Sequence, residues 1–107
     1  MSFEQYHEPA NELSDATRTF ARIVIGLIEE AEAINWYEQR MSVEKNEDAK
    51  AIIQNAQREE MKHFSMDLEF LFRNKPDWRL ISSHVLFQDG DIVELGEQAE
   101  EHMDAAE

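Results

Sequence analysis

The chain has 107 residues, among them 24 acidic and 10 basic side chains, with a formal net charge of −14 and no cysteine. Proteins bind phosphate backbones through clustered Lys and Arg, so this composition argues against nucleic-acid binding. The lack of cysteine excludes disulfides, thiolate zinc sites and iron–sulfur clusters, and it fits a reducing compartment. No signal-peptide pattern is visible, and the longest apolar run, residues 23–28, is too short to span a bilayer. We therefore expect one small cytoplasmic domain.

A first long helix is predicted from about Pro9 to Met41, because proline suits a first helical position and the next turn-forming stretch is residues 42–48. Steps of three and four residues trace an apolar seam along it: Phe20, Ile23, Leu27, Glu30, Ile34, Tyr37 and Met41. Glu30 is the one charged member of this seam. A carboxylate inside a packing seam is costly unless something neutralises it.

A second long helix is predicted from about Glu47 to Asn74, ending before Pro76. It has two apolar seams. One seam consists of Ile53, Ala56, Glu60, His63, Asp67 and Phe70, and the other of Met61, Phe64, Leu68 and Leu71. A helix that is apolar on two sides must be covered on two sides. A short third helix, residues 77–87, is too short to cover its full length, so we expect the chain to oligomerise.

The remaining residues, 88–107, carry eight acidic side chains and neither Lys nor Arg. Such a stretch is typical of a solvated or disordered tail. The predicted organisation is therefore a helical unit, residues 1–87, followed by an acidic C-terminal segment, residues 88–107.

Glu60 and His63 lie three residues apart, so both side chains leave the same face of the second helix. Carboxylate-bridged di-iron sites in four-helix bundles take a Glu from each of two helices and Glu-x-x-His from each of the other two. This chain supplies one of each, with Glu30 on the first helix. The pattern predicts an all-α fold of two long antiparallel helices plus a short third helix, half a ferritin-like four-helix bundle completed by dimerisation. Carboxylate and imidazole ligands suit Fe, Mn or Zn.

Other interpretations remain open at this point. Glu30 could form an ordinary salt bridge with Arg58 or Lys62 across the hairpin. The protein could also be a rubrerythrin-like, peroxide-reducing di-iron enzyme, although no cysteine-based electron-transfer site is present. In a third reading it is a non-enzymatic helical oligomer or adaptor whose Glu and His side chains bind zinc or nothing.

Two stretches, "IEEAEAINWYEQR" (28–40) and "REEMKHFSMDLEFLFRN" (58–74), resemble the encapsulated ferritins, as do "HVLF" and the opening "HEPANELS". The resemblance covers about residues 7–93. It implies a ferroxidase that oxidises Fe(II) to Fe(III) for iron storage within an encapsulin nanocompartment. In this family two subunits build a di-iron centre between them, with two Fe per subunit pair, and the dimers assemble into a decameric ring.

The resemblance also implies roles for individual residues. The ferroxidase ligands would be Glu30, Glu60 and His63, and Tyr37 would form a hydrogen bond within the site. An entrance for iron would comprise Glu29, Glu32 and Trp36. From the residues alone, Trp36 and Tyr37 are equally explained by packing, and the two acids by a solvated face.

The chain departs from the family pattern in two places. Some relatives have an outer metal site, of which only Glu59 remains here, beside Asn55 and Lys62. The family's cargo-loading tail, a flexible linker with a Gly-Ser-Leu-rich end, does not follow within these residues. Either that tail has been removed, or the chain is not loaded in the usual way. We expect the other histidines to be surface or tail residues rather than ligands: His7, His84 and His102.

Overall fold

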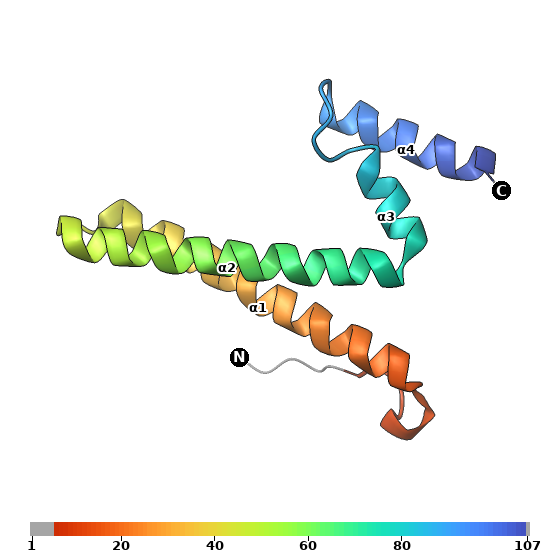
Figure 1. Ribbon diagram of the computed structural model, residues 1–107, viewed down its shortest axis with the longest axis horizontal. Coiled ribbons are helices and arrows are strands. Elements are labelled where there is room, and N and C mark those ends of the chain that lie inside the picture. Colours follow the sequence, from red (N-terminus) through yellow and green to blue (C-terminus); the bar gives the residue numbers. More distant parts are fainter. Residues whose placement is uncertain (1–5, 107) are drawn as a thin grey trace. The chain divides into compact units, whose positions relative to one another are not determined.

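The computed structural model describes the backbone of residues 6–106 and the side chains of residues 6–104, and all the regular structure in this part of the chain is helical. A short 3-10 helix, η1 (Ala10–Glu12), precedes four α-helices (Figure 1). These are α1 (Asp15–Val43), α2 (Glu47–Asn74), α3 (Pro76–Ser83) and α4 (Ile92–Ala106). The contacts divide the chain into one unit that ends at Leu71 and a second that begins at Phe72. The all-α prediction is confirmed.

Three helices begin at a polar side chain that accepts a hydrogen bond from the first turn, which satisfies a backbone N–H that would otherwise lack a partner. Ser14 Oγ accepts from the Thr17 amide at 3.1 Å, Asn46 Oδ1 from the Ala49 amide at 3.0 Å, and Asp91 Oδ1 from the Glu94 amide at 3.0 Å.

The start of the first helix was predicted too early. Pro9 precedes η1 rather than α1, and Leu13 then has extended backbone angles (φ −83°, ψ 137°) that interrupt the helix. The Ser14 cap places the first residue of α1 at Asp15. The bounds of the second helix, by contrast, are as predicted.

α1 and α2 form an antiparallel hairpin (Figure 1). Gln57 on α2 donates a hydrogen bond from Nε2 to the Ile34 carbonyl on α1 at 3.2 Å, and Asp67, later on α2, lies opposite Gly26, earlier on α1. Gln57 is 6 % exposed and Leu71 is completely buried. All members of the predicted seam on α1 are half-buried. The seam is therefore the face that α1 turns toward α2.

Several apolar side chains of α2 are exposed in the described part of the chain. Ile52 is 70 % exposed, Met66 63 % and Phe70 38 %. On a helical wheel these positions lie within about 60° of His63, and they border Asp67, which faces α1. Phe70 belongs to one of the two predicted seams, whereas Ile52 and Met66 belong to neither, so the exposed apolar residues lie beside the predicted seams rather than along them.

The predicted third helix is shorter than expected. The amides of Val85 and Leu86 both donate to the Ser82 carbonyl, at 3.1 and 2.8 Å, and Phe87 has a φ of 63°. This left-handed backbone is unfavourable for a bulky side chain and cannot continue a right-handed helix. α3 therefore ends at Ser83, and residues 84–87 form a turn.

The prediction of a solvated or disordered tail was wrong for α4. Leu95, Ala99 and Met103 recur every four residues and form an apolar stripe, along which Ala99 is completely buried. α4 packs against α3, and the rings of His84 and His102 lie 4.5 Å apart between their centroids. The acidic composition made this apolar stripe difficult to recognise in the sequence, because the many charged residues occupy the other faces of the helix.

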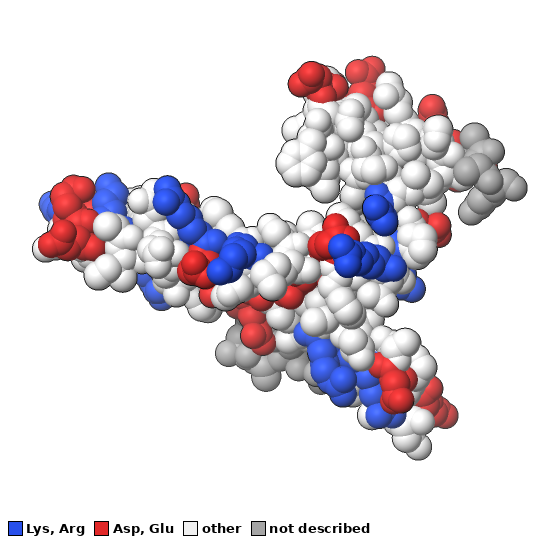
Figure 2. All heavy atoms as spheres, viewed as in Figure 1, with Lys and Arg blue, Asp and Glu red and all other residues white. Residues whose placement is uncertain are grey.

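Despite the net charge, acidic and basic side chains are interspersed along the hairpin on the face shown in Figure 2. Among the helices of the described residues, none combines the length and hydropathy needed to cross a membrane.

Candidate functional site

Glu30 lies in the middle of α1 and points into the hairpin. One of its oxygens, Oε2, is buried and has no hydrogen-bond partner among the described atoms. Burial raises the pKa of Glu30 to about 7, helped by a hydrogen bond with Asp67 and by the negative charges of Asp67, Glu60 and Glu29. Two carboxyl groups can share a hydrogen bond only if one of them holds a proton. With this pKa, Glu30 is partly protonated near neutral pH.

Asp67 is the neighbour of Glu30 that the sequence analysis did not single out as a site residue. It comes from α2 and faces Gly26, one turn before Glu30 on α1. A Cβ atom at Gly26 would lie 3.4 Å from Asp67 Oδ2, so the carboxylate closely approaches the α1 backbone. The sequence did contain an indication of this residue, because Asp67 is a second acidic residue in the same α2 seam as Glu60, seven residues later.

Glu60 and His63 share one face of α2, as their spacing predicts. His63 Nδ1 lies 3.9 Å from Glu60 Oε1, and the two side chains are 47 % and 26 % exposed, respectively. Glu60 is also close enough for its charge to act on Glu30. Glu60 is therefore near both the half-buried Glu30 on α1 and the more open His63 imidazole.

The alternative in which Glu30 forms a salt bridge with Arg58 or Lys62 does not describe this structure. Lys62 pairs instead with Glu59, Nζ to Oε2, at 2.8 Å. This hydrogen bond lowers the pKa of Glu59. The charges that act on Glu30 are all carboxylates. Glu59, which the family resemblance associated with an outer metal site, is thus paired with a basic side chain.

The donor set suits a divalent cation but is incomplete in one chain. Carboxylate oxygens and an imidazole nitrogen are ligands for Fe, Mn or Zn, and a buried oxygen without a partner is a place where a cation would relieve a cost. In the described part of the chain, however, no three acidic or histidine side chains are arranged to hold a metal ion. A complete site therefore needs ligands from elsewhere or a change in side-chain positions.

Tyr37 and Trp36, which were also predicted to belong to the site, differ in their exposure. Tyr37 is half-buried, and the Arg40 guanidinium carbon lies 5.3 Å from its ring centroid. Trp36 is 51 % exposed and lines an open hollow of about 390 Å³ with Gln39 and Arg40.

The two acids predicted at the entrance differ from each other. Glu29 is exposed but contributes to the raised pKa of Glu30, whereas Glu32 is half-buried. Neither lines the hollow beside Trp36.

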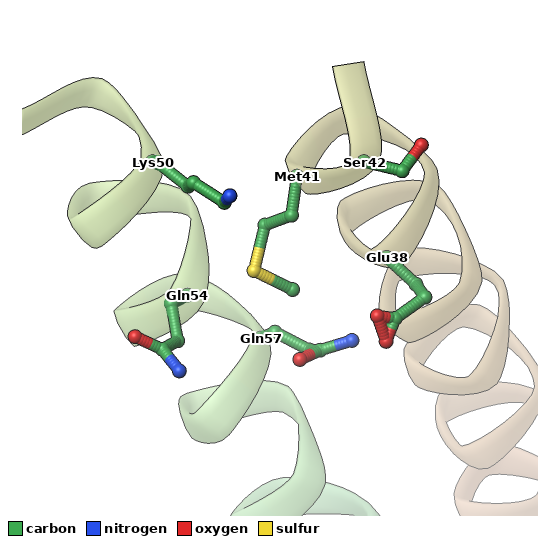
Figure 3. Close-up of a pocket in the computed structure, with 6 residues that line it drawn as sticks. All are labelled: Glu38, Met41, Ser42, Lys50, Gln54 and Gln57. Carbon is green, nitrogen blue, oxygen red and sulfur yellow. The ribbon is translucent and has the colours of Figure 1, made fainter. Parts of the chain in front are cut away.

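A larger hollow, of about 590 Å³, lies toward the closed end of the hairpin rather than at the carboxylates. Figure 3 shows Met41 pointing into it between the two helices, with the Gln57 amide directed toward Glu38. Its lining holds one carboxylate, on Glu38, so it offers far less for a metal than the Glu30 cluster.

The raised pKa of Glu30 predicts how the stability of the metal-free protein depends on pH. Between pH 4.5 and about 7 the folded state holds a proton that the unfolded state has lost, so this group stabilises the fold at low pH and the contribution disappears as the pH rises. Glu30→Gln, which keeps a neutral side chain, should therefore become progressively more stable relative to the parent across this window and level off above it. Urea unfolding of chelator-treated protein measures this.

Glu69→Gln is the matched control, because it removes one charge from an exposed position of α2. A difference between Glu30→Gln and the parent that stays constant from pH 4 to 8 would contradict the interpretation.

Comparisons with known proteins agree with this architecture. A family model described as EncFtn-like matches residues 5–89. A ferritin-like protein of Thermotoga maritima is 42 % identical over 95 residues, which cover 89 % of this chain and 83 % of the relative. An encapsulated ferritin-like protein of Rhodospirillum rubrum is 34 % identical over 89 residues, which cover 83 % of this chain and 64 % of the relative.

A solved structure is also similar. The crystal structure of a Nitrosomonas europaea protein superposes with a TM-score of 0.78 at 39 % identity, over 81 % of this chain and 96 % of that one. The helical fold is thus that of half a ferritin-like bundle. With the family model matching most of its length, the chain belongs to the EncFtn-like family of encapsulated ferritin-like proteins.

Proposed function

We propose that this protein is a ferroxidase that oxidises Fe(II) to Fe(III) at a di-iron centre shared between two copies of the chain. The observation that supports this most is the half-buried Glu30 carboxylate, whose charged neighbours are all acidic and which has one buried oxygen without a partner among the described atoms. Such a group is costly in a packed seam unless a cation compensates it. Fe(II) is the substrate that the family membership favours.

The second copy is needed because one chain supplies too few ligands. Glu30, Glu60 and His63 are one half of the pattern that four-helix di-iron proteins use. His63 is also the most open of the three, and it lies near the exposed apolar residues of α2. Two hairpins packed antiparallel through these residues would bring two such half-sites together. Assembly of these dimers into a decameric ring is part of the same proposal.

The protein's own contribution to the reaction is to hold two Fe(II) ions close together. Carboxylate oxygens from Glu30 and Glu60 favour the ferric state, and the His63 imidazole completes the set from the same face of α2. Each iron gives up one electron, and dioxygen accepts the two electrons with two protons to form hydrogen peroxide. Tyr37 lies two turns beyond Glu30 on α1, where it would form a hydrogen bond within the assembled site.

The fate of the product follows from the shape of the building block. A hairpin that contributes half a bundle encloses no storage cavity, so the ferric mineral would need a separate shell. The relative from Rhodospirillum rubrum is described as encapsulated, which supports an encapsulin nanocompartment as that shell. The proposed location is therefore the cytoplasm, inside such a compartment.

The first test of the proposal is to remove the ligands one at a time. We expect Glu30→Ala, Glu60→Ala and His63→Ala each to lose most of the ferroxidase activity, because each two-fold centre loses two ligands per substitution. Aerobic Fe(II) oxidation followed by absorbance measures the rate, and circular dichroism checks that the helices persist. Full activity in any two of the three variants would mean that the site lies elsewhere. If the parent protein itself oxidises Fe(II) no faster than the uncatalysed reaction, the protein is a non-enzymatic adaptor rather than a ferroxidase.

The second test concerns assembly. We expect the parent protein to form dimers or larger species on addition of Fe(II) under anaerobic conditions, because a shared cation removes the repulsion between carboxylates across the two-fold axis. Sedimentation velocity with and without the ion measures the mass. A protein that stays monomeric in both conditions would contradict a site built between copies.

The third test concerns the entrance. Glu29, Glu32 and Trp36 share one stripe of α1 that is separate from the face of Glu30, so they are placed to influence the approach of iron rather than its binding. We expect Trp36→Ala to widen the path and speed oxidation, and Glu32→Ala to weaken attraction or loosen the gate and so alter the rate. Stopped-flow oxidation over a range of Fe(II) concentrations measures both. Rates equal to the parent's in both variants would show that the stripe is only a solvated or packing face.

A further inference from the structure

The apolar stripe through which α4 packs against α3 continues beyond the buried part of the helix. Ile92, in the first turn of α4, comes seven residues before Ala99, about two helical turns, so the two lie on the same side of the helix. Ala99 is completely buried, whereas Ile92 is 75 % exposed. α3 has 8 residues and α4 has 15, so α3 does not run along the whole stripe. The first turn of α4 therefore presents apolar surface that stays exposed in the described part of the chain.

Two further apolar side chains lie close to Ile92 along the chain. Val93, its neighbour in α4, is 70 % exposed, and Phe87, in the turn after α3, is fully exposed. Exposed apolar side chains scattered singly are normal on a protein surface, but a concentration of them marks an interaction site. Here three large ones fall within residues 87–93 of a strongly charged protein.

Gly96 lies beside these side chains on an open helix surface. It follows Val93 by three residues and Ile92 by four, so it is the helical neighbour of both. A Cβ atom at Gly96 would meet no atom of another part of the described chain within 4 Å. Glycine destabilises the interior of a helix relative to alanine, and no contact of these residues requires it at this position. A glycine on an exposed face does allow another backbone to approach closely.

The charged residues within residues 87–97 are all carboxylates: Asp89, Asp91, Glu94 and Glu97. No Lys or Arg follows Arg79 in the sequence. In a two-fold contact between copies, the same surface patch meets itself, so these carboxylates would be brought together and would repel one another. An apolar surface with acidic surroundings instead complements a partner whose apolar side chains are flanked by Lys or Arg.

We propose that the α4 patch, which comprises Phe87, Ile92, Val93 and Gly96, is a docking site for an amphipathic helix of a partner protein, with an apolar face flanked by Lys or Arg. The large side chains of the patch contact that apolar face, and the carboxylates attract the flanking charges. Gly96 lets the two helices come close, because the distance between packed helices depends on the side chains at the contact.

This docking site is separate from the candidate metal ligands. The ligands lie in the hairpin, within the unit that ends at Leu71, and the α4 patch lies in the unit that begins at Phe72. The family model matches residues 5–89 and so ends before α4 begins. The inference therefore does not depend on the proposed ferroxidase activity.

Three fluorescein-labelled peptides of equal length test the partner chemistry. The first has leucines at helical spacing flanked by lysines, the second has glutamates in place of the lysines, and the third contains the residues of the first in scrambled order. Fluorescence anisotropy with the full chain at physiological ionic strength gives the affinities. We expect the first peptide to bind at least about tenfold more tightly than either of the others, because it alone combines an apolar face with the complementary charge.

Gly96→Gln separates docking from a structural role. Glutamine is a better helix former and would extend into open space, so the Tm of the variant should equal or exceed the parent's. Its side chain would nevertheless obstruct a partner helix. We expect Gly96→Gln and Val93→Ser each to weaken binding of the first peptide at least about tenfold, as the loss of a central contact typically does. Val43→Ser, at a position of α1 that is 75 % exposed, is the matched control and should bind like the parent.

Four results would overturn the proposal. No measurable binding of the first peptide would show that the patch does not take such a partner, and equal binding of the first peptide and either of the others would show that sequence pattern or charge does not matter. Unchanged affinity in Gly96→Gln or in Val93→Ser would place the contact elsewhere. A sedimentation mass that is lower for Val93→Ser than for the parent, without peptide, would show that a second copy of the chain covers the patch.

Discussion

The proximity of like charges in the half-buried space between α1 and α2 is the constraint that governs this hairpin. Glu30 occupies the centre of an otherwise apolar or aromatic seam, and its charged neighbours are carboxylates. In the metal-free state the conflict is relieved by a proton, which is why the pKa of Glu30 rises to about 7. A proton compensates only one charge among three groups. A divalent cation would compensate two, and this is the physical reason for connecting the fold to a metal-dependent activity.

The rest of the hairpin can be understood as support for this cluster. Gln57 ties α2 to the α1 backbone at Ile34, which holds the two helices together two turns or more from the glycine contact. Gly26 allows Asp67 to approach α1 closely. Leu71, completely buried, supplies apolar packing one turn beyond Asp67. The carboxylates are therefore held by packing and hydrogen bonds on both sides, rather than by ion pairs of their own.

The exposed apolar residues of α2 connect the carboxylate cluster with the assembly of two copies of the chain. An isolated helical hairpin buries little surface, and here two side chains of the described residues are fully buried, Leu71 and Ala99. The exposed Ile52, Met66 and Phe70 lie on the side of α2 that also presents His63. The same surface is thus available for apolar packing and for completing a ligand set. A shared metal centre would make the two processes depend on each other.

Much of this arrangement was predictable from the order of the residues. The apolar seam of α1, the bounds of α2 and the common face of Glu60 and His63 follow from helical periodicity and from proline chemistry, both of which are local. Local reasoning failed where tertiary contacts or unusual backbone angles decide. The turn at Phe87, which makes α3 shorter than predicted, depends on a positive φ that cannot be predicted from the residue types. The stripe that orders α4 was obscured by its many acids.

The sequence by itself determined that the chain is helical, that it belongs to a half-bundle class and that Glu30, Glu60 and His63 are the candidate ligands, because these depend on residue type and spacing along single helices. Only the tertiary structure decided which carboxylates meet. Asp67 approaches Glu30 because antiparallel packing places residue 67 opposite residue 26, and Lys62 bonds to Glu59 on its own helix instead of crossing to Glu30. Both outcomes depend on the register between two helices, a property that no single helix contains.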